Sequence, residues 1–474
     1  MHRYSLLALA VLAATSITVS AQDPGTIPWT PKDGGDLRMV AIEVPTRYAS
    51  VGLDPNVHRL RIPEGWRASV FFAGNGINKA RFMAWGPDSV LFVANMSGNN
   101  ILALPDRDRN GVADTVIVAA RGFSYGHDVR FHRDTMYVAQ EAGIVKLWRT
   151  DPSGYVYDQR RTVVDKVGQQ NQTGGNHRTR TLVVDTVRNV FYLSIGSRGN
   201  ADREADRALI EEYQFDGSGR RVYASGVRNA VGMTLHPRTG RLWANNNGSD
   251  NQGNNVPPEW VDMVRDGGFY GYPYAYHYRR FFNFTGDYQD LLPITAADSA
   301  RLDRMSAPAA LVDAHCAPMA LVFTESTPLP QYRYGAFMAM RGSWNRNPPS
   351  GAKIVFLAFD DDADTIANVV RDFCTGFITD TNNVGTRWGR PVGLALSGDG
   401  SVYVSVDDGK QMILKLTPPQ TTSVDNDASS SIRIAPNPTT DVCTIHLAEQ
   451  GAIIRVFTLT GERVADVRVE GYHA

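Results

Sequence analysis

The chain has 474 residues, 43% of them hydrophobic, and a formal net charge of −1. A chain of this length can bury a large core and has room for one large domain with smaller additions. The balanced charge gives no electrostatic case for binding nucleic acid or an anionic membrane. With 43 glycines and 10% aromatic residues, the composition favours an all-β protein with many turns.

The N-terminal segment is expected to be a targeting signal. His2 and Arg3 give it a basic start, and an apolar run follows at 6–19. Val-Ser-Ala at 19–21 fits a signal-peptidase site. We therefore expect residues 1–21 to be a signal peptide, with an uncleaved anchor as the alternative. The protein is expected to pass through the periplasm and to be secreted or held at the cell surface, with no later transmembrane span.

One strand pair recurs along the chain. An alternating apolar strand is followed by a short polar turn and a second strand with large apolar residues. The six copies begin at Arg81, Val129, Thr181, Gly232, Ala320 and Gly393. The first four start roughly 50 residues apart, near the period of propeller blades. Six copies predict an all-β, six-bladed β-propeller over residues 22–417. A row of Ig-like sandwiches is the alternative, but no linker separates the copies.

An acidic loop follows the first copy, in the run Asp106-Arg-Asp-Arg-Asn-Gly-Val-Ala-Asp114. Oxygen ligands at alternate positions, with glycine at the sixth, resemble the first half of an EF-hand loop. No glutamate stands at the twelfth position. We predict a structural calcium site, and a solvated β-turn is the alternative. The expected ligands are Asp106, Asp108, Asn110 and Asp114.

Helical signal is almost absent between the copies, and Glu204 to Glu212 is the best short candidate. Insertions rich in Asn, Gly and Tyr lie at 245–258 and 269–284. Long loops on a rigid scaffold usually build the site. The three cysteines, at 316, 374 and 443, match no metal or disulfide framework, and no C-x-x-C-H motif indicates a covalent haem. A redox role would therefore need a separate electron acceptor.

The organisation changes near Pro418. Residues 418–431 are rich in Pro, Ser and Thr and are expected to form a flexible linker. Residues 432–474 contain Pro-Asn-Pro at 436–438 and Leu-Thr-Gly-Glu-Arg-Val at 459–464. They resemble the C-terminal sorting domain of type IX secretion cargo. The resemblance implies a small β-sandwich tail, here shortened, and the type IX secretion machinery as a partner.

From about Asp106 to Asp408 the chain resembles the glucose/sorbosone dehydrogenase family. No single motif is specific to this family, but the joint order of seven motifs over most of the chain is specific to it. The motifs are Gly-Asn-His-Arg-Thr-Arg-Thr-Leu at 175–182, Phe-Tyr-Leu-Ser-Ile-Gly-Ser-Arg-Gly-Asn at 191–200, Ala-Ser-Gly-Val-Arg-Asn-Ala-Val-Gly at 224–232, Gly-Gly-Phe-Tyr-Gly-Tyr-Pro at 267–273, Ala-His-Cys-Ala-Pro at 314–318, Arg-Gly-Ser-Trp-Asn-Arg at 341–346 and Trp-Gly-Arg-Pro-Val-Gly at 388–393.

The resemblance implies a pyrroloquinoline quinone site and roles for individual residues. His177, before a blade's first strand, would be the general base that takes a substrate hydroxyl proton. Arg228 and Asn229 would contact the quinone, and Arg228 would also stabilise charge growing on the quinone oxygen. Arg341 and Arg390 match further cationic positions. The Asn/Gly loop at 245–258 matches the region that holds the quinone's calcium.

Some positions depart from the soluble glucose enzyme of the family. Val392 stands where that enzyme has a second pocket arginine, and Arg341 stands where it has a lysine. His127 lies near its glutamine position. These changes are more similar to the sorbosone branch. A structural role for each residue is the alternative: a loop histidine at 177, or inter-blade ion pairs for the arginines. His127 and His315 compete with His177 because both precede blade strands.

The sequence thus predicts an exported oxidoreductase that oxidises an aldose, aldehyde or sugar alcohol with pyrroloquinoline quinone and calcium. A separate cytochrome or quinone would take the electrons onward. A non-catalytic propeller that binds glycan or protein is the alternative from another class, because fold alone does not determine function. A metal-dependent lactonase is the third hypothesis, but it would need several carboxylates around a central ion.

Overall fold

A computed structural model describes residues 29–168, 172–324 and 329–419. In the tail it describes the backbone of four strands, β31 (Arg433–Ala435), β32 (Thr444–His446), β33 (Ile453–Phe457) and β34 (Arg463–Arg468). They pair as two antiparallel ladders, β31 with β32 and β33 with β34. The predicted signal peptide and most of the predicted linker lie outside the described residues. Within the described part of the chain, no helix is long and apolar enough to cross a membrane.

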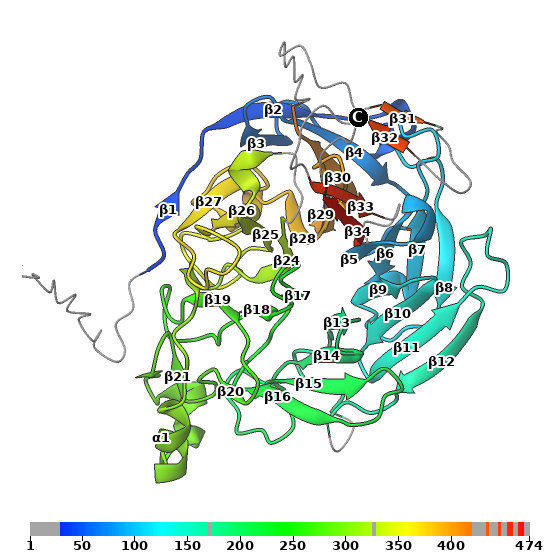
Figure 1. Ribbon diagram of the computed structural model, residues 1–474. Helices are drawn as coiled ribbons and strands as arrows, with labels where there is room; N and C mark the ends of the chain where they lie inside the picture. The colour runs from blue at the N-terminus through cyan, green and yellow to red at the C-terminus, as the bar shows by residue number, and fades with distance from the viewer. Residues whose placement is uncertain are drawn as a thin grey trace, which may run out of the picture.

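Six antiparallel sheets are arranged around a common axis, and the prediction of a six-bladed propeller is confirmed (Figure 1). Named from the axis outward, the first blade consists of β5 (Ala80–Trp85), β6 (Leu91–Asn95), β7 (Asn100–Leu104) and β8 (Ile117–Arg121), and the second of β9 (Asp128–His132), β10 (Thr135–Gln140), β11 (Gly143–Trp148) and β12 (Gln159–Val164). The third blade consists of β13 (Leu182–Asp185), β14 (Val190–Ile195), β15 (Leu209–Gln214) and β16 (Arg221–Ser225), and the fourth of β17 (Met233–Leu235), β18 (Leu242–Asn246), β19 (Glu259–Met263) and β23 (Ala310–Val312). The fifth blade consists of β24 (Pro318–Phe323), β25 (Gly335–Met340), β26 (Lys353–Ala358) and β27 (Val369–Cys374), and the sixth of β28 (Gly389–Leu396), β29 (Val402–Gly409), β30 (Met412–Thr417) and β4 (Arg67–Ala73).

The six sequence repeats are the two innermost strands of the six blades. Innermost strands contact those of both neighbouring blades, for example β5 with β9 and β28. Second strands are sandwiched between blades, and every residue of β6, β14 and β25 is buried. A strand covered on both faces gains from burying apolar side chains throughout, which explains the strong apolar signal of these pairs.

The ring is closed by an N-terminal strand. β4 supplies the outer strand of the last blade and pairs antiparallel with β30, with Val70 opposite Leu414. β2 (Leu37–Glu43) and β3 (Arg59–Pro63) extend this sheet, and η1 (Thr46–Val51) lies between them. β1 (Lys32–Asp33) pairs with β27 of the preceding blade. The N-terminal segment therefore ties the first and last parts of the propeller together.

The expected helix at Glu204 to Glu212 is wrong. Residues 209–214 form β15, which pairs with β14 and β16. Leu209, Ile210 and Tyr213 are buried in two adjacent cores, so burial in the blade overrides local helix propensity. The one α-helix among the described residues is α1 (Ala296–Leu302). It begins at a capping box formed by Thr295 and Asp298, a sequence signature that we missed.

A long insertion lies between the third and fourth strands of the fourth blade, at 264–309. β20 (Gly268–Phe269) pairs parallel with β16 at the outer edge of the third blade. β21 (Ala275–Tyr276), β22 (Arg280–Phe281), η4 (Gly286–Leu291) and α1 follow. These elements pack around their own aromatic core, which includes Phe269, Tyr274, Phe282 and Tyr288. The insertion thereby passes outside one blade and reaches the loops described below.

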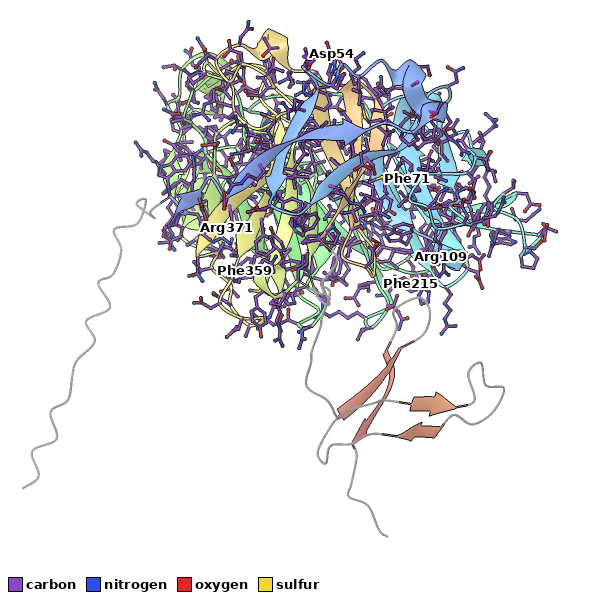
Figure 2. The ribbon with its side chains drawn as sticks, turned by 90° about the horizontal axis from the view of Figure 1, so that it is seen from above. Asp54, Phe71, Arg109, Phe215, Phe359 and Arg371 are labelled. Atoms are coloured by element: carbon purple, nitrogen blue, oxygen red, sulfur yellow. The ribbon has the colours of Figure 1, made fainter. Side chains whose placement is uncertain are left out.

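The antiparallel order gives the disc two different faces. The face that we call the site face carries the loops into each innermost strand and the loops from second to third strands. Loops after third strands lie on the opposite face, where Figure 2 shows Arg109, Phe215 and Phe359. Asp54 of the N-terminal segment lies on the side of the disc away from these three residues, above the strands in Figure 2.

Candidate functional site

His177 lies on the site face, in the loop that enters β13, as the sequence predicts. Its ring Nδ1 lies 2.8 Å from the carbonyl oxygen of Ser197 and 3.0 Å from Ser197 Oγ. A carbonyl oxygen only accepts, so Nδ1 carries the proton and donates to it. Ser197 Oγ in turn donates to the carbonyl of Gly199, at 2.7 Å. The neutral ring therefore keeps its lone pair on Nε2, which is the form that a general base requires.

Burial and the positive charge around His177 keep its ring neutral. Burial, followed by the positive charge of Arg228, lowers the pKa of His177 to about 3. Arg207 contributes in the same direction, and its guanidinium donates to the carbonyls of Gly196 and His177, at 2.8 and 2.9 Å. This buried arginine fixes the His177 backbone, a role that the sequence analysis did not identify.

Gly196 brings His177 and Asn229 together. A Cβ at position 196 would lie 2.5 Å from His177 Cβ and 2.6 Å from Asn229 Oδ1. Real Cβ atoms do not approach other atoms this closely, so only glycine fits between the two side chains. The Asn229 backbone N–H donates to Asn246 Oδ1 at 3.0 Å, which ties this segment to the next blade.

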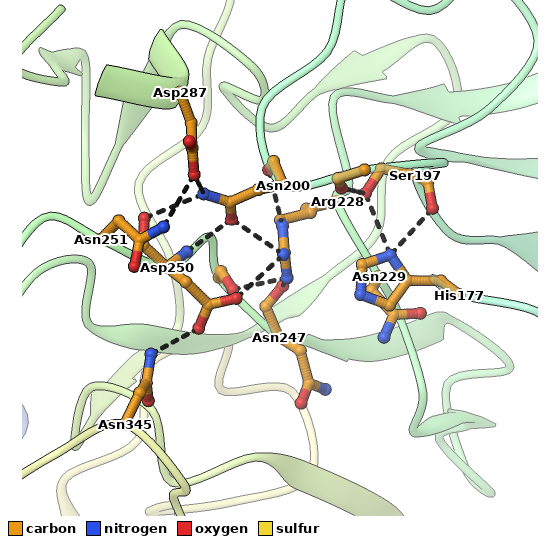
Figure 3. Close-up of polar contacts among 12 residues, drawn as sticks. His177, Ser197, Asn200, Arg228, Asn229, Asn247, Asp250, Asn251, Asp287 and Asn345 are labelled. Atoms are coloured by element: carbon orange, nitrogen blue, oxygen red, sulfur yellow. Dashed lines mark hydrogen bonds and ion pairs between the residues drawn. The ribbon is translucent and has the colours of Figure 1, made fainter. Parts of the chain in front are cut away.

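Arg228 is buried and holds three loops together (Figure 3). Its Nε and Nη2 donate to the backbone and side-chain oxygens of Asn200, both at 3.1 Å. Its Nη1 donates to the carbonyls of Asn247 and Gly248, at 3.3 and 2.6 Å. The Gly248 N–H donates to Glu259, whose burial raises the pKa of that carboxyl group to about 8. Arg228 therefore orders the part of the 245–258 loop that presents backbone carbonyls.

Asp250 lies at the centre of the same network (Figure 3). One carboxylate oxygen accepts from Asn345 Nδ2 at 2.7 Å, and the other lies 3.4 Å from Arg228 Nη2. Its backbone carbonyl accepts from the hydroxyl of Tyr288, at 2.6 Å, so the insertion supports this loop. Asn200 and Asn345 each belong to a motif of the family resemblance, but nothing in the sequence distinguishes them from other loop asparagines.

Arg341 and Arg390 form a second cluster, on the last two blades. Arg341 Nε donates to both oxygens of Asp407, at 2.9 and 3.1 Å, and Arg81 pairs with the same carboxylate at 2.5 Å. Arg390 Nε donates to the Arg341 carbonyl at 3.1 Å. Burial, with the charges of Arg341 and Arg387, lowers the pKa of Arg390 to about 9.

Charge is unbalanced in this second cluster. Three guanidinium groups, of Arg81, Arg341 and Arg390, form ion pairs there with only two carboxylates. Asp408 is the second carboxylate and lies 3.8 Å from both Arg341 and Arg390. Val392, where the soluble glucose enzyme has an arginine, is instead fully buried in the main core. Arg387, which the sequence analysis missed, brings its charge to Arg341 and Arg390.

His127 and His315, the alternatives to His177 as the general base, make different contacts from His177. His127 is fully buried, and its Nδ1 accepts from Arg81 Nε at 3.1 Å, so its proton lies on Nε2. Burial and the Arg81 charge also lower its pKa. His315 is 6% exposed and donates from Nε2 to the Gly253 carbonyl at 3.0 Å, with Nδ1 3.9 Å from Asp250. His177 is more exposed than either.

The acidic loop at 106–114 lies on the opposite face, between β7 and β8. Carboxylate oxygens of Asp106, Asp108 and Asp114 lie within 4.8 Å of one another. Burial raises the pKa of Asp106, and the neighbouring Asp108 acts in the same direction. Asn110 Oδ1 accepts from the Val112 N–H at 2.8 Å, so it shapes the turn. The structure thus groups the three aspartates, away from His177 and Arg228.

Comparisons with known proteins agree with this architecture. The TrAA12-like family model matches residues 60–416. A pyrroloquinoline quinone-dependent pyranose dehydrogenase of Coprinopsis cinerea is 27% identical over 376 residues, covering 65% of this chain. The chain spans about half the length of that curated relative, or 48%.

Two solved structures share the fold. The holo form of a pyranose dehydrogenase PQQ domain from Coprinopsis cinerea has a TM-score of 0.62 at 22% identity, covering 80% of this chain and 100% of that chain. The calcium structure of a Trichoderma reesei protein of Carbohydrate-Active Enzymes Family AA12 has a TM-score of 0.63 at 20% identity, covering 77% of this chain and 98% of that chain.

Proposed function

The chain belongs to the TrAA12-like family, and on that premise we propose that it is an oxidoreductase that oxidises a sugar with pyrroloquinoline quinone. The observation that carries this proposal is the neutral His177, with its lone pair on Nε2, beside the buried cation of Arg228. The Coprinopsis cinerea relative, described as a quinone-dependent pyranose dehydrogenase, supports the same reaction.

The donor set fits an anionic quinone. Pyrroloquinoline quinone carries carboxylates, and a guanidinium binds a carboxylate with two parallel hydrogen bonds. The cluster of Arg341, Arg387 and Arg390 has more positive than negative charge, which a bound anion would balance. Arg228, Asn229, Arg341 and Arg390 would hold the cofactor. Once bound, the quinone would supply the acceptor for a hydride.

His177 would take the proton of the substrate hydroxyl on Nε2. A hydroxyl is too weak an acid to ionise unaided near neutral pH, so alcohol oxidation needs a positioned base. The Ser197 carbonyl, at 2.8 Å from Nδ1, would hold the ring in the required tautomer and stabilise it as the proton arrives. Burial of Arg228 would keep positive charge next to the reacting centre.

We assign two roles to calcium within this proposal. The carbonyls of Asn247 and Gly248, on the loop that resembles the quinone's calcium region, are hard oxygen ligands beside Arg228. Asp106, Asp108, Asn110 and Asp114 would bind a separate structural ion on the opposite face. The calcium structure of the Trichoderma reesei AA12 protein supports calcium in this fold.

The finer specificity and the location are further parts of the proposal. The departures at positions 127, 341 and 392 favour a sorbosone-like substrate among aldoses, aldehydes and sugar alcohols. The predicted signal peptide at 1–21 and the motifs in the tail that resemble a sorting domain favour export through the type IX machinery. Outside the cytoplasm, a separate cytochrome or quinone would accept the electrons.

Reconstitution tests the proposed function. Purified protein is titrated with pyrroloquinoline quinone and calcium, and dye reduction is followed with a panel of aldoses, aldehydes and alditols. We expect saturable quinone binding and turnover with at least one sugar. A protein that binds no quinone, or that binds it without oxidising any member of the panel, would contradict the proposal.

A further inference from the structure

Trp344, on the site face, is the most exposed tryptophan among the described residues. Its side chain is 71% exposed, compared with 44% for Trp29 and 40% for Trp148. It lies in the loop from β25 to β26, which also carries Arg341 and Asn345. Single exposed apolar side chains are common on protein surfaces, so the case for a role of Trp344 rests on the loop that carries it and on the contacts that anchor that loop.

The loop around Trp344 is held rigidly on both sides. Asn345 donates to Asp250 at 2.7 Å, and the Ser343 carbonyl accepts from Arg387 at 2.7 Å. Asn347 exchanges hydrogen bonds with Asn254, at 2.6 and 3.2 Å. The backbone on either side of the exposed indole is therefore anchored, and the loop can present an aromatic face without the entropy cost of ordering it.

The anchors also place the loop beside the proposed reacting centre. Asn345 contacts the carboxylate that Arg228 also contacts. Arg341, three residues before Trp344, belongs to the cationic cluster on Asp407. Trp344 thus lies on a loop that touches both halves of the candidate site, while the indole itself remains open to solvent.

We propose that Trp344 is a specificity-determining platform for the ring of a pyranose sugar, an inference that rests on the proposed function. One face of a pyranose presents several C–H groups, and these match the negative face of an aromatic ring. An open-chain alditol or a short aldehyde has no fixed apolar face to stack. The platform therefore favours cyclic sugars over the open-chain members of the proposed substrate class.

Binding and kinetics of Trp344→Ala test this proposal. The cofactor-free protein is titrated with D-glucose, D-galactose, D-mannose and L-fucose, and with the alditol D-glucitol, and binding is measured by titration calorimetry. For the best-bound pyranose we expect dissociation constants about five- to twenty-fold higher in Trp344→Ala than in the wild type. In the quinone-loaded enzyme, KM should rise by a similar factor while kcat stays within about twofold.

Two control variants separate stacking from a structural effect. Trp344→Phe keeps an aromatic face and should recover part of the affinity. Trp148→Ala removes an exposed tryptophan at the end of β11 on the opposite face and should bind sugars as the wild type does. The melting temperature of Trp344→Ala should be unchanged, because the side chain is largely in water.

Three results would overturn the proposal that Trp344 is a platform. They are that no pyranose binds the wild type, that Trp344→Ala binds pyranoses as the wild type does, or that Trp344→Ala loses as much affinity for D-glucitol as for the pyranoses. Failure of the proposed function looks different. In that case the wild type would bind a pyranose through Trp344 but would show no turnover after loading with quinone.

Discussion

His177 and Asn229 can both lie close to residue 196 because that residue has no side chain. Gly196→Ala would put a methyl group 2.5 Å from His177 Cβ, and one of the three segments must move. We expect a loss of stability of about 1–3 kcal/mol, typical of overpacking, and weaker quinone binding. Gly398→Ala, where no atom lies within 4 Å of the added Cβ, is the matched control. Equal melting temperatures and quinone affinities in both variants would remove Gly196 from the site.

The lowered pKa of His177 has a consequence for stability against pH. The folded pKa, about 3, lies below the ordinary value of 6.5, so between these values the unfolded chain binds a proton that the native protein does not. The stability contributed by the neutral ring is present above pH 6.5 and is lost as pH falls, by at most about 1.4 kcal/mol per pH unit. The melting temperature of His177→Gln should therefore fall less than that of the wild type between pH 7 and pH 5. Parallel curves would show that His177 titrates normally.

At the scale of single residues, the sequence identified the polar side chains only where a motif singled them out. His177, Arg228, Arg341 and Arg390 all lie on the site face. Asn200, Asp250 and Asn345 come from three different loops and meet only through the fold. Because polar residues are common in such loops, no local pattern could have selected these three.

Among the elements, the acidic loop between β7 and β8 invites a direct test. The N-terminal segment is fastened to it, since Arg47 and the Tyr48 hydroxyl both donate to the Ala113 carbonyl, at 2.8 and 3.0 Å. A calcium ion would therefore stabilise more than its own turn, through binding to the native state alone. We expect a chelator to lower the melting temperature of the wild type. The double variant Asp106→Ala, Asp108→Ala should show a smaller chelator shift, and an equal shift would make this loop a simple turn.

Among the elements, the sequence predicted those strands that are buried on both faces. The innermost strand pairs were recognisable from their apolar runs. The outer strands were not, and β12 shows why, because four of its six residues are exposed and its sequence is Gln-Arg-Arg-Thr-Val-Val. Likewise, no local pattern indicates that β4 pairs with β30, about 340 residues later, or that the insertion at 264–309 reaches Asp250. Such long-range pairings depend on the closed ring rather than on neighbouring residues.

For the whole molecule, the place where β4 and β30 close the ring of blades determines how much of the chain the propeller needs. β30 ends at Thr417 and holds β4, and Pro419 packs close to Gly65. A chain that ends after Pro419 should keep its melting temperature within a few degrees, because all six blades remain complete. A chain that ends after Lys410 loses β30 and should not fold. A large loss of stability in the longer chain would show that the tail is part of the propeller.

The central claim, that this propeller oxidises sugars with His177 as the base, is tested most directly by turnover of quinone-loaded variants. With the best substrate of the panel, His177→Ala should lower kcat by about 10²- to 10⁴-fold, the usual contribution of general base catalysis. Quinone affinity should change little, and His315→Ala and His127→Ala, if folded, should retain most of their turnover. Near wild-type turnover in His177→Ala, with turnover abolished in folded His315→Ala or His127→Ala, would contradict the account.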